Sequence, residues 1–179
     1  MFKKILLALV VAVAAFAGYV ALQPSHYALT RSTVVDVAPV VVFDHVNDFR
    51  KWEAWSPWAK LDPAATVSFA GPASGKGAVF KWAGNSQVGE GSMTIVDSRP
   101  GEAVAIKLAF VKPLEGESDV AFALQPEGGA TRVTWSLSGE QTFLERAMCT
   151  LMGGMERILG PQYEKGLANL KAVAEGRKG

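Results

Sequence analysis

Three of the five tryptophans in this chain lie within one segment of seven residues, at positions 52, 55 and 58. An indole ring offers a large apolar surface and one N–H donor, so it can close a hydrophobic core or line a site for an apolar ligand. We favour a structural role in which Trp52, Trp55 and Trp58 close one end of the core. The alternative is that they form the rim of a cavity or a lip that faces a membrane. Trp82 and Trp135 are expected in the core or in a cavity wall.

A second group of candidate residues is rich in methionine. Met148, Met152 and Met155 lie close together near the carboxyl end. Ordinary core packing is the simplest interpretation, but flexible thioethers also suit an adaptable pocket for a hydrophobic ligand. The residues predicted to line such a cavity are Trp55, Trp58, Phe80, Trp82, Met93, Phe122, Trp135, Met148, Met152 and Met155.

The remaining polar residues do not predict catalysis or metal binding. Cys149 is the single cysteine, so an intramolecular disulfide and a multi-thiolate zinc site are excluded, and an inert buried thiol is expected. His26 and His45 are far in sequence from any partner. The loop from Gly71 to Gly77 lacks the spacing of a phosphate-binding loop and is expected to be a turn. Carboxylates are scattered, and Glu90 is the first to test for acid–base chemistry. No metal or cofactor is expected.

The composition is that of an apolar, nearly neutral protein. The 179 residues are 49% hydrophobic and 20% charged, with 18 Lys and Arg against 17 Asp and Glu. This length fits one domain, with or without an appendage. Because no basic stripe is present, nucleic acid is not an expected partner.

The first 22 residues are predicted to be a separate apolar segment. Two lysines, at positions 3 and 4, precede an uncharged run of 18 residues from Ile5 to Leu22, close to the length that spans a bilayer as a helix. One interpretation is a single membrane anchor that leaves residues 23–179 outside the cytoplasm. The other is a signal peptide cleaved after Ala15-Phe16-Ala17, which would leave a secreted or periplasmic domain. We favour the anchor because the apolar run continues beyond this cleavage site.

Residues 23–179 are predicted to form an antiparallel sheet with helices at both ends. A first strand runs from about Tyr27 to Val37, and short helices follow between Pro39 and Trp55. Later segments alternate between apolar and polar residues, which is typical of antiparallel strands with one buried face. Six more strands are expected, at Val67–Phe69, Gly77–Trp82, Val88–Asp97, Ala103–Phe110, Glu117–Gln125 and Thr131–Ser138.

After Gly139 the pattern is helical. Thr142 and Glu145 match a capping box, and Gly160-Pro161 is expected to kink or split the long helix that follows. This helix is the only element large enough to cover the concave face of a curved sheet. We therefore expect an α+β fold, with six to seven antiparallel strands wrapped on a long carboxy-terminal helix. Such an arrangement often leaves an apolar cavity.

Short motifs occur in a characteristic order along this part of the chain. They are Arg31-Ser32, Ala38-Pro39, Trp52-x-x-Trp55-Ser56-Pro57-Trp58, Asp62-Pro63, Gly71-Pro72, Gly89-x-Gly91-Ser92-Met93, Val133-Thr134-Trp135 and Gly160-Pro161. In this order they resemble the START-like (SRPBCC) superfamily, which includes polyketide cyclase/dehydrase-type proteins, plant allergens and lipid-transfer domains. The resemblance is greatest to bacterial membrane-anchored or exported members and implies a helix-grip fold for residues 23–179. The superfamily hosts several functions, so the motifs indicate the fold more strongly than the activity.

Three functions are compatible with the sequence. The leading hypothesis is non-catalytic binding of a hydrophobic small molecule or lipid in the sheet–helix cavity, outside the cytoplasm and attached to the membrane by the amino-terminal helix. One alternative is a polyketide cyclase-like enzyme, which needs at least two polar side chains converging inside the cavity. The other is a structural or interaction domain with a filled core. The sequence indicates no particular protein partner.

Overall fold

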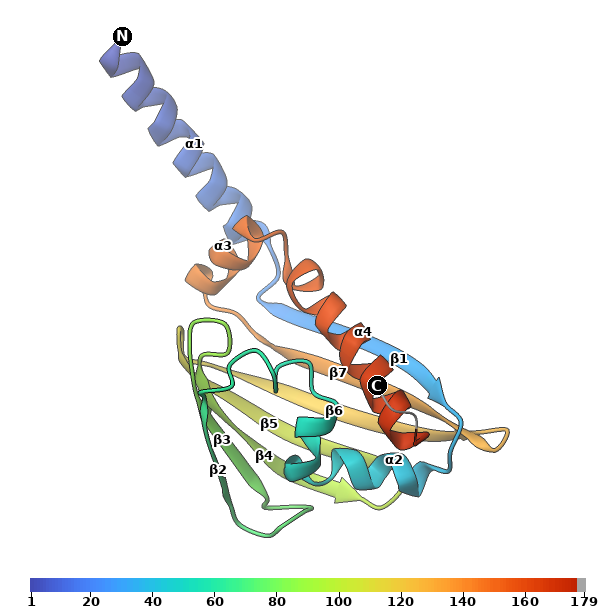
Figure 1. Cartoon of the computed structure of the whole chain (residues 1–179). Helices are drawn as coiled ribbons and strands as arrows, with labels where there is room; N and C mark the ends of the chain where they lie inside the picture. The colour runs from blue at the N-terminus through green and yellow to red at the C-terminus, as the bar shows by residue number, and fades with distance from the viewer. Residues whose placement is uncertain (177–179) are drawn as a thin grey trace.

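The computed structural model describes residues 1–176, and its amino-terminal helix extends away from the rest of the protein (Figure 1). This helix, α1 (Phe2–Leu22), has a mean hydropathy of 2.7 over its most apolar window, of which 6% is buried in the protein. Its 21 residues correspond to about 30 Å at 1.5 Å per residue. It is therefore long and apolar enough to cross a membrane, although a signal sequence has the same properties.

The body of the protein is built on one antiparallel sheet. Its spatial order is β1-β7-β6-β5-β4-β3-β2, so consecutive strands pair from β2 to β7 and β1 is added beside β7. This confirms the predicted sheet, at the upper end of the expected strand number. The strands are β1 (His26–Val35), β2 (Thr66–Ala70), β3 (Val79–Ala83), β4 (Glu90–Arg99), β5 (Ala103–Lys112), β6 (Gly116–Glu127) and β7 (Ala130–Glu140).

Alternation along the strands places one row of apolar side chains on the concave face. In β7, Val133, Trp135 and Leu137 are buried, whereas Thr134 and Ser136 between them are only half-buried. This follows from the two-residue period of a strand, which sends successive side chains to opposite faces. The concave face is the one that the helices cover.

Two short helices lie across part of the concave face. They are α2 (Pro39–Val46), which has its proline in the first turn, and the 3-10 helix η1 (Phe49–Ala54). Val42 and Val46 are fully buried, and they mark the face of α2 that packs on the sheet. Val40, which lies on the opposite side of the helix, is 62% exposed.

The carboxy-terminal helix is divided at a different place from the one predicted. It forms α3 (Phe143–Leu151) and α4 (Met155–Ala174), and Pro161 lies inside α4. The division falls at Gly153 and Gly154, whose φ angles of +94° and +93° are in the left-handed region that glycine adopts at little cost. The two glycines, and not Gly160-Pro161, therefore end the first helix.

The beginning of α3 agrees with the sequence prediction. Thr142 Oγ1 accepts a hydrogen bond from the backbone N–H of Glu145, and Glu145 Oε2 accepts one from the backbone N–H of Thr142 at 2.7 Å. These reciprocal bonds satisfy two donors that a helix start otherwise leaves free. The predicted capping box is confirmed.

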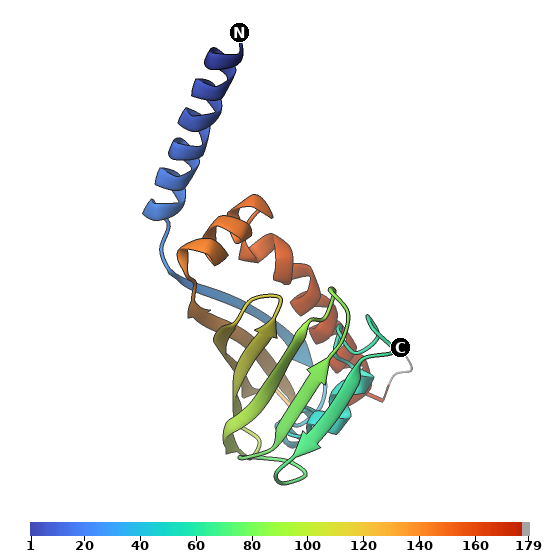
Figure 2. The same ribbon diagram turned by 90° about the vertical axis from the view of Figure 1, so that its left-hand side faces the viewer.

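Helix α4 covers only one side of the concave face. It lies along β1, with Tyr163, Leu167 and Leu170 buried beneath it (Figures 1 and 2). Arg31 Nε of β1 donates to Glu164 of α4 at 2.9 Å, and a second bond from Arg31 goes to Glu156.

At the far side of the sheet, η1 reaches β2 and β3 through two side chains. The ring of Phe49 lies 6.1 Å from the ring of Phe80, and the guanidinium of Arg50 lies 4.8 Å above the ring of Phe69.

Candidate ligand-binding face

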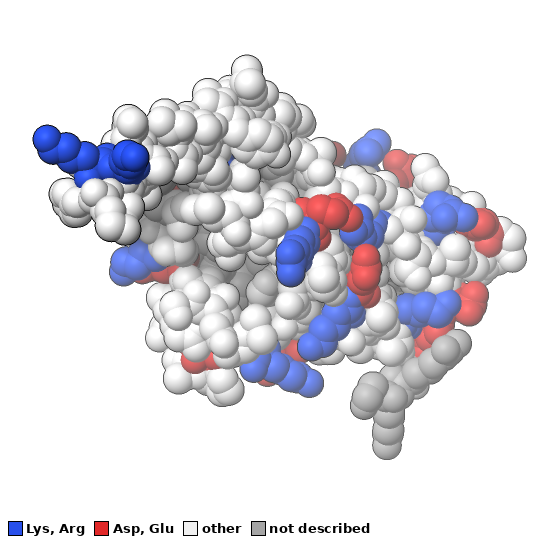
Figure 3. All heavy atoms as spheres, turned by 90° about the horizontal axis from the view of Figure 1, so that it is seen from above, with Lys and Arg blue, Asp and Glu red and all other residues white. Residues whose placement is uncertain are grey.

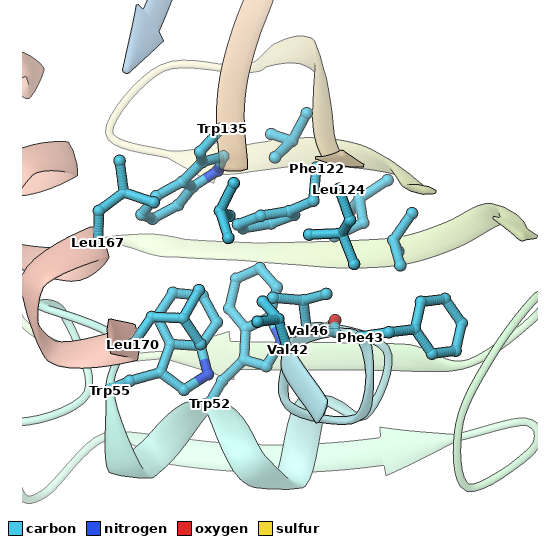
Figure 4. Close-up of a cluster of buried hydrophobic side chains, with 14 of the residues drawn as sticks. Val42, Phe43, Val46, Trp52, Trp55, Phe122, Leu124, Trp135, Leu167 and Leu170 are labelled. Carbon is cyan, nitrogen blue, oxygen red and sulfur yellow. Dashed lines mark hydrogen bonds between the residues drawn. The ribbon is translucent and has the colours of Figure 1, made fainter. Parts of the chain in front are cut away.

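The space beneath α4 is filled by a cluster of aromatic rings. Trp135 lies at its centre, stacked on Tyr163 with centroids 4.0 Å apart and on Phe122 at 5.1 Å. Trp55 meets Trp135 edge-on at 5.6 Å (Figure 4). All four residues are buried. The protein's own side chains thus occupy the predicted cavity at this position, and Trp55, Phe122 and Trp135 belong to the core.

The first two tryptophans of the seven-residue cluster fasten η1 to α2. Trp52 Nε1 donates to the carbonyl of Val46 at 3.1 Å, and Trp55 Nε1 donates to the carbonyl of His45 at 3.3 Å. A buried indole N–H usually has a hydrogen-bond partner, and here the carboxyl end of α2 supplies both acceptors. Trp58 is half-buried and meets the ring of Trp135 edge-on at 6.0 Å.

The far part of the sheet carries a second apolar surface on its concave side. The pairing register places its side chains in two rows across β2 to β5, one through Phe69, Phe80 and Met93 and the other through Val67, Trp82 and Phe110. Val67, Phe69 and Phe110 are between 37% and 53% exposed, and the others are half-buried. We call these six residues the open face. Three of them, Phe80, Trp82 and Met93, were predicted from the sequence as lining residues.

The aromatic rings of the open face are held in fixed positions. Trp82 stacks on Phe80 with centroids 5.8 Å apart, and it meets Phe110 edge-on at 5.6 Å. Its Nε1 donates to the carbonyl of Val88 at 2.9 Å. A Cβ at Gly91, directly opposite, would lie 2.7 Å from the Trp82 ring, so the glycine makes room for the indole. The result is a preformed apolar platform.

A pair of hydroxyl groups extends one of these rows. Beyond Met93 the row continues through Leu108 to Ser118 in β6, and then through Gly139 in β7 to Tyr27 in β1. Tyr27 Oη and Ser118 Oγ are hydrogen-bonded at 2.6 Å. The concave face therefore combines an apolar surface with a polar pair at one side, in which Ser118 is buried and Tyr27 is half-buried.

Burial keeps the phenol groups on this side of the sheet neutral. It raises the pKa of Tyr27, although the bond to Ser118 opposes the shift in part. Burial also raises the pKa of Tyr163, and the nearby Tyr27 raises it further. Neutral phenols donate and accept hydrogen bonds, but they are not bases. Sequence reasoning missed Tyr27 and Ser118 because 91 positions separate them, and only the strand register brings them together.

The methionines lie away from the open face. Met148 in α3 and Met152 just after it are exposed, and Met155 is half-buried at the start of α4. The structure does not bring them together with Phe80 and Trp82. Their place as lining residues thus remains a prediction from sequence.

Two surface grooves lie outside the concave face. One of about 290 Å³ runs between β1 and α4, beside Arg31, Glu164 and Lys171. The other, of about 350 Å³, is on the outer side of β2 to β5 and includes Lys81 and Glu90. Glu90 pairs there with Lys112 at 2.7 Å, so this carboxylate does not point into an apolar cavity. A view from the α1 end shows a further hollow in the surface (Figure 3).

Metal binding finds no support in the described part of the chain. Within residues 1–176, no three side chains of His, Cys, Asp or Glu are grouped so that they could hold a metal ion. The chemistry that the concave face offers is apolar contact together with neutral hydrogen bonding.

Comparison with known families agrees with this architecture. Residues 26–175 match the family described as polyketide cyclase/dehydrase and lipid transport. The chain belongs to this family. Since the match covers the sheet and its helices, the resemblance to the START-like superfamily is confirmed. No curated protein sequence matched the chain.

Solved structures share the fold at low sequence identity. The solution structure of the Aha1 dimer from Colwellia psychrerythraea is 15% identical, with 86% of this chain and 99% of that one covered and a TM-score of 0.61. Ara h 8.0201 is 10% identical, with 85% and 99% covered and a TM-score of 0.58. The di-domain ARO/CYC BexL from the BE-7585A biosynthetic pathway is 15% identical, with 89% and 53% covered and a TM-score of 0.60. These likenesses confirm the helix-grip fold.

Proposed function

We propose that this protein binds, without transforming it, a hydrophobic small molecule or lipid on the open face. The apolar part of the ligand lies against Phe80, Trp82 and Phe110, and one polar group reaches the Tyr27–Ser118 pair. The observation that carries the proposal is the row of cross-strand neighbours on one concave surface, which runs from Phe69 and Phe80 to the Tyr27–Ser118 hydroxyl pair. Ligand sites commonly combine an apolar wall with a few polar groups that fix orientation.

The family and the amino-terminal helix support this proposal. Lipid transport is part of the family's description, which suits an apolar ligand. Helix α1 supplies the attachment that we propose, a single span with residues 23–179 outside the cytoplasm, and Lys3 and Lys4 on the inner side. A domain held at a bilayer in this way has a source of apolar ligands next to it.

An enzymatic function is the second candidate. The specific observation in its favour is the convergence of Tyr27 and Ser118 at 2.6 Å on the concave face. Against it, the pKa of Tyr27 is raised, so the phenol would stay protonated and could orient or polarise a carbonyl but not abstract a proton. If the wild-type protein converted a bound ligand to a product and Tyr27→Phe did not, this result would favour an enzymatic function.

Native mass spectrometry of the full chain tests ligand binding without a prior choice of ligand. The chain would be purified from its membranes in a mild detergent and released in the gas phase. We expect an added mass of a few hundred daltons that extraction with organic solvent recovers as an apolar compound. A protein that carries no such mass, and that binds no member of a lipid panel, would contradict the proposal.

Substitutions at two adjacent residues of β5 would test which side of the sheet binds the ligand. Phe110 faces the concave side and Val111 the outer side, and both are exposed. A carboxylate is costly in an apolar contact, so Phe110→Asp is expected to weaken ligand binding at least about tenfold. Val111→Asp is the matched control and is expected to bind as the wild type does. If Val111→Asp lost the ligand and Phe110→Asp kept it, the outer groove would be the site.

A further inference from the structure

Helix α3 turns its apolar side away from the protein. Five large apolar residues on it or just after it are between 41% and 74% exposed, and no residue of the helix is buried. A helix that covers a core shows the reverse arrangement, with the apolar stripe inward. The exposed residues are Phe143, Leu144, Met148, Leu151 and Met152.

The polar side of α3 is the side that contacts the protein. Arg146 Nη1 donates to the carbonyl of Gln23 at 2.6 Å, which ties the helix to the segment just after α1. Glu145, Cys149 and Thr150 share this side, and each is half-buried. The polar side of α3 is therefore tied to the protein by the bond from Arg146, and its apolar side stays largely exposed.

The end of α1 lies directly beside α3. Val20, in the last turn of α1, is fully buried, and α1 and α3 are in contact. Figure 2 shows α3 next to the carboxyl end of α1, at the same end of the sheet. If α1 spans a bilayer from Lys3 and Lys4 onward, its last turn lies at the outer interface. Tyr19 is exposed at this level, where tyrosine is enriched in membrane proteins.

We propose that α3 lies in the outer interface of the bilayer that α1 crosses, with its apolar side among the acyl chains. The partner is the lipid surface itself, because α1 brings α3 to that depth and the exposed side of α3 is apolar over its whole length. An amphipathic helix at an interface buries such a side in this way.

This arrangement also sets where the open face points. The loop between β3 and β4 and the end of β5, next to Trp82 and Phe110, lie at the α3 end of the sheet (Figure 1). The concave face would then open toward the lipid, so an apolar ligand could pass between bilayer and protein without crossing water. This inference deepens the proposed function and rests on it for the identity of the ligand.

Fluorescent probes on single cysteines measure the depth of α3. The full chain with Cys149→Ser would carry an environment-sensitive probe at Leu144→Cys or Leu151→Cys, in vesicles that contain lipids with a nitroxide quencher on the acyl chain. Val40→Cys is the matched control, an exposed valine on α2 at the opposite end of the protein. Val10→Cys, in the middle of α1, reports on the span itself.

We expect the probes at positions 144 and 151 to shift to shorter emission wavelength and to lose at least about half of their intensity to the quencher. The probe at position 40 should be unaffected. Probes on α3 that behave like the one at position 40 would overturn the proposal, whether position 10 is quenched or not. Ligand retention, measured separately by native mass spectrometry, distinguishes this failure from a failure of the proposed function.

Discussion

Trp82 and Gly91 together set the shape of the open face. The indole can lie across the sheet only because the residue opposite it on β4 has no side chain, and the bond to Val88 then holds the ring. The sequence indicated that Trp82 was a residue of the core or of a cavity wall and that the Gly89-x-Gly91 motif belonged to the fold. It could not indicate that the two act together, since this depends on the β3–β4 register.

Tyr27 and Ser118 illustrate the same limit for polar residues. Neither residue belongs to a recognisable sequence motif, and a Tyr or a Ser at such a position in a strand is not by itself a sign of a binding site. Gly139 brings them together, because a Cβ at this position would lie 2.6 Å from Tyr27 Oη. Pairings of this kind come from a register across three strands, which a sequence pattern does not contain.

His45 gives a prediction for the pH dependence of stability. Burial lowers its pKa below the ordinary 6.5, Asp44 opposes this shift, and Lys51 adds to it. Its Nδ1 is buried with no hydrogen-bond partner within the described residues. The unfolded chain therefore takes up the proton first, and stability is full above pH 6.5 and is lost as the pH falls toward the folded pKa.

We expect the free energy of unfolding in urea, measured in detergent micelles, to decrease as the pH is lowered from about 7 to 5.5. His45→Asn should have a flatter pH profile over this window, because the group that titrates is gone. An unchanged slope in His45→Asn would assign the pH dependence to other residues.

At the scale of elements, the contact between α4 and β7 depends on Gly166. A Cβ at this position would lie 2.7 Å from the ring of Trp135 and 3.1 Å from Pro57 Cδ. Alanine favours a helix over glycine by about 1 kcal/mol, but the clash with a buried indole is larger. We expect Gly166→Ala to lower the free energy of unfolding by about 1–3 kcal/mol.

The neighbouring position supplies the control for this prediction. Lys165 is exposed on the same helix, and Lys165→Ala should change the free energy of unfolding by less than about 0.5 kcal/mol. Both variants would be compared by urea denaturation followed by circular dichroism. A Gly166→Ala protein as stable as the wild type would mean that α4 does not pack tightly on Trp135.

The elements themselves were largely predictable, but the division of the carboxy-terminal helix was not. Alternation along the strands and the capping box at Thr142 are local patterns, and the structure confirms them. Pro161 was expected to interrupt the helix, yet it is exposed, so water can satisfy the carbonyl that it leaves unpaired. The two consecutive glycines at positions 153 and 154 were the stronger sequence signal for the end of a helix, and both have positive φ angles in the structure.

At the scale of the whole molecule, one helix is too narrow to cover a seven-stranded sheet. Helix α4 packs on the β1 side, where aromatic rings fill the space, and α2 packs on the middle of the sheet. The six residues of the open face, on β2 to β5, remain only partly covered. The sequence predicted a cavity between sheet and helix, and the structure instead divides the concave face into a filled half and an open half. This division moves the expected site to the open half.

Photoaffinity labelling of the full chain in vesicles tests this account most directly. A fatty acid with a diazirine on its chain would be bound and irradiated, and the modified peptides would be mapped by mass spectrometry. We predict labels on the segments that carry the open face, residues 67–69, 80–82, 91–93 and 108–110, with loss of labelling in Phe110→Asp and not in Val111→Asp. Labels confined to the groove between β1 and α4, or to the outer side of the sheet, would contradict the account.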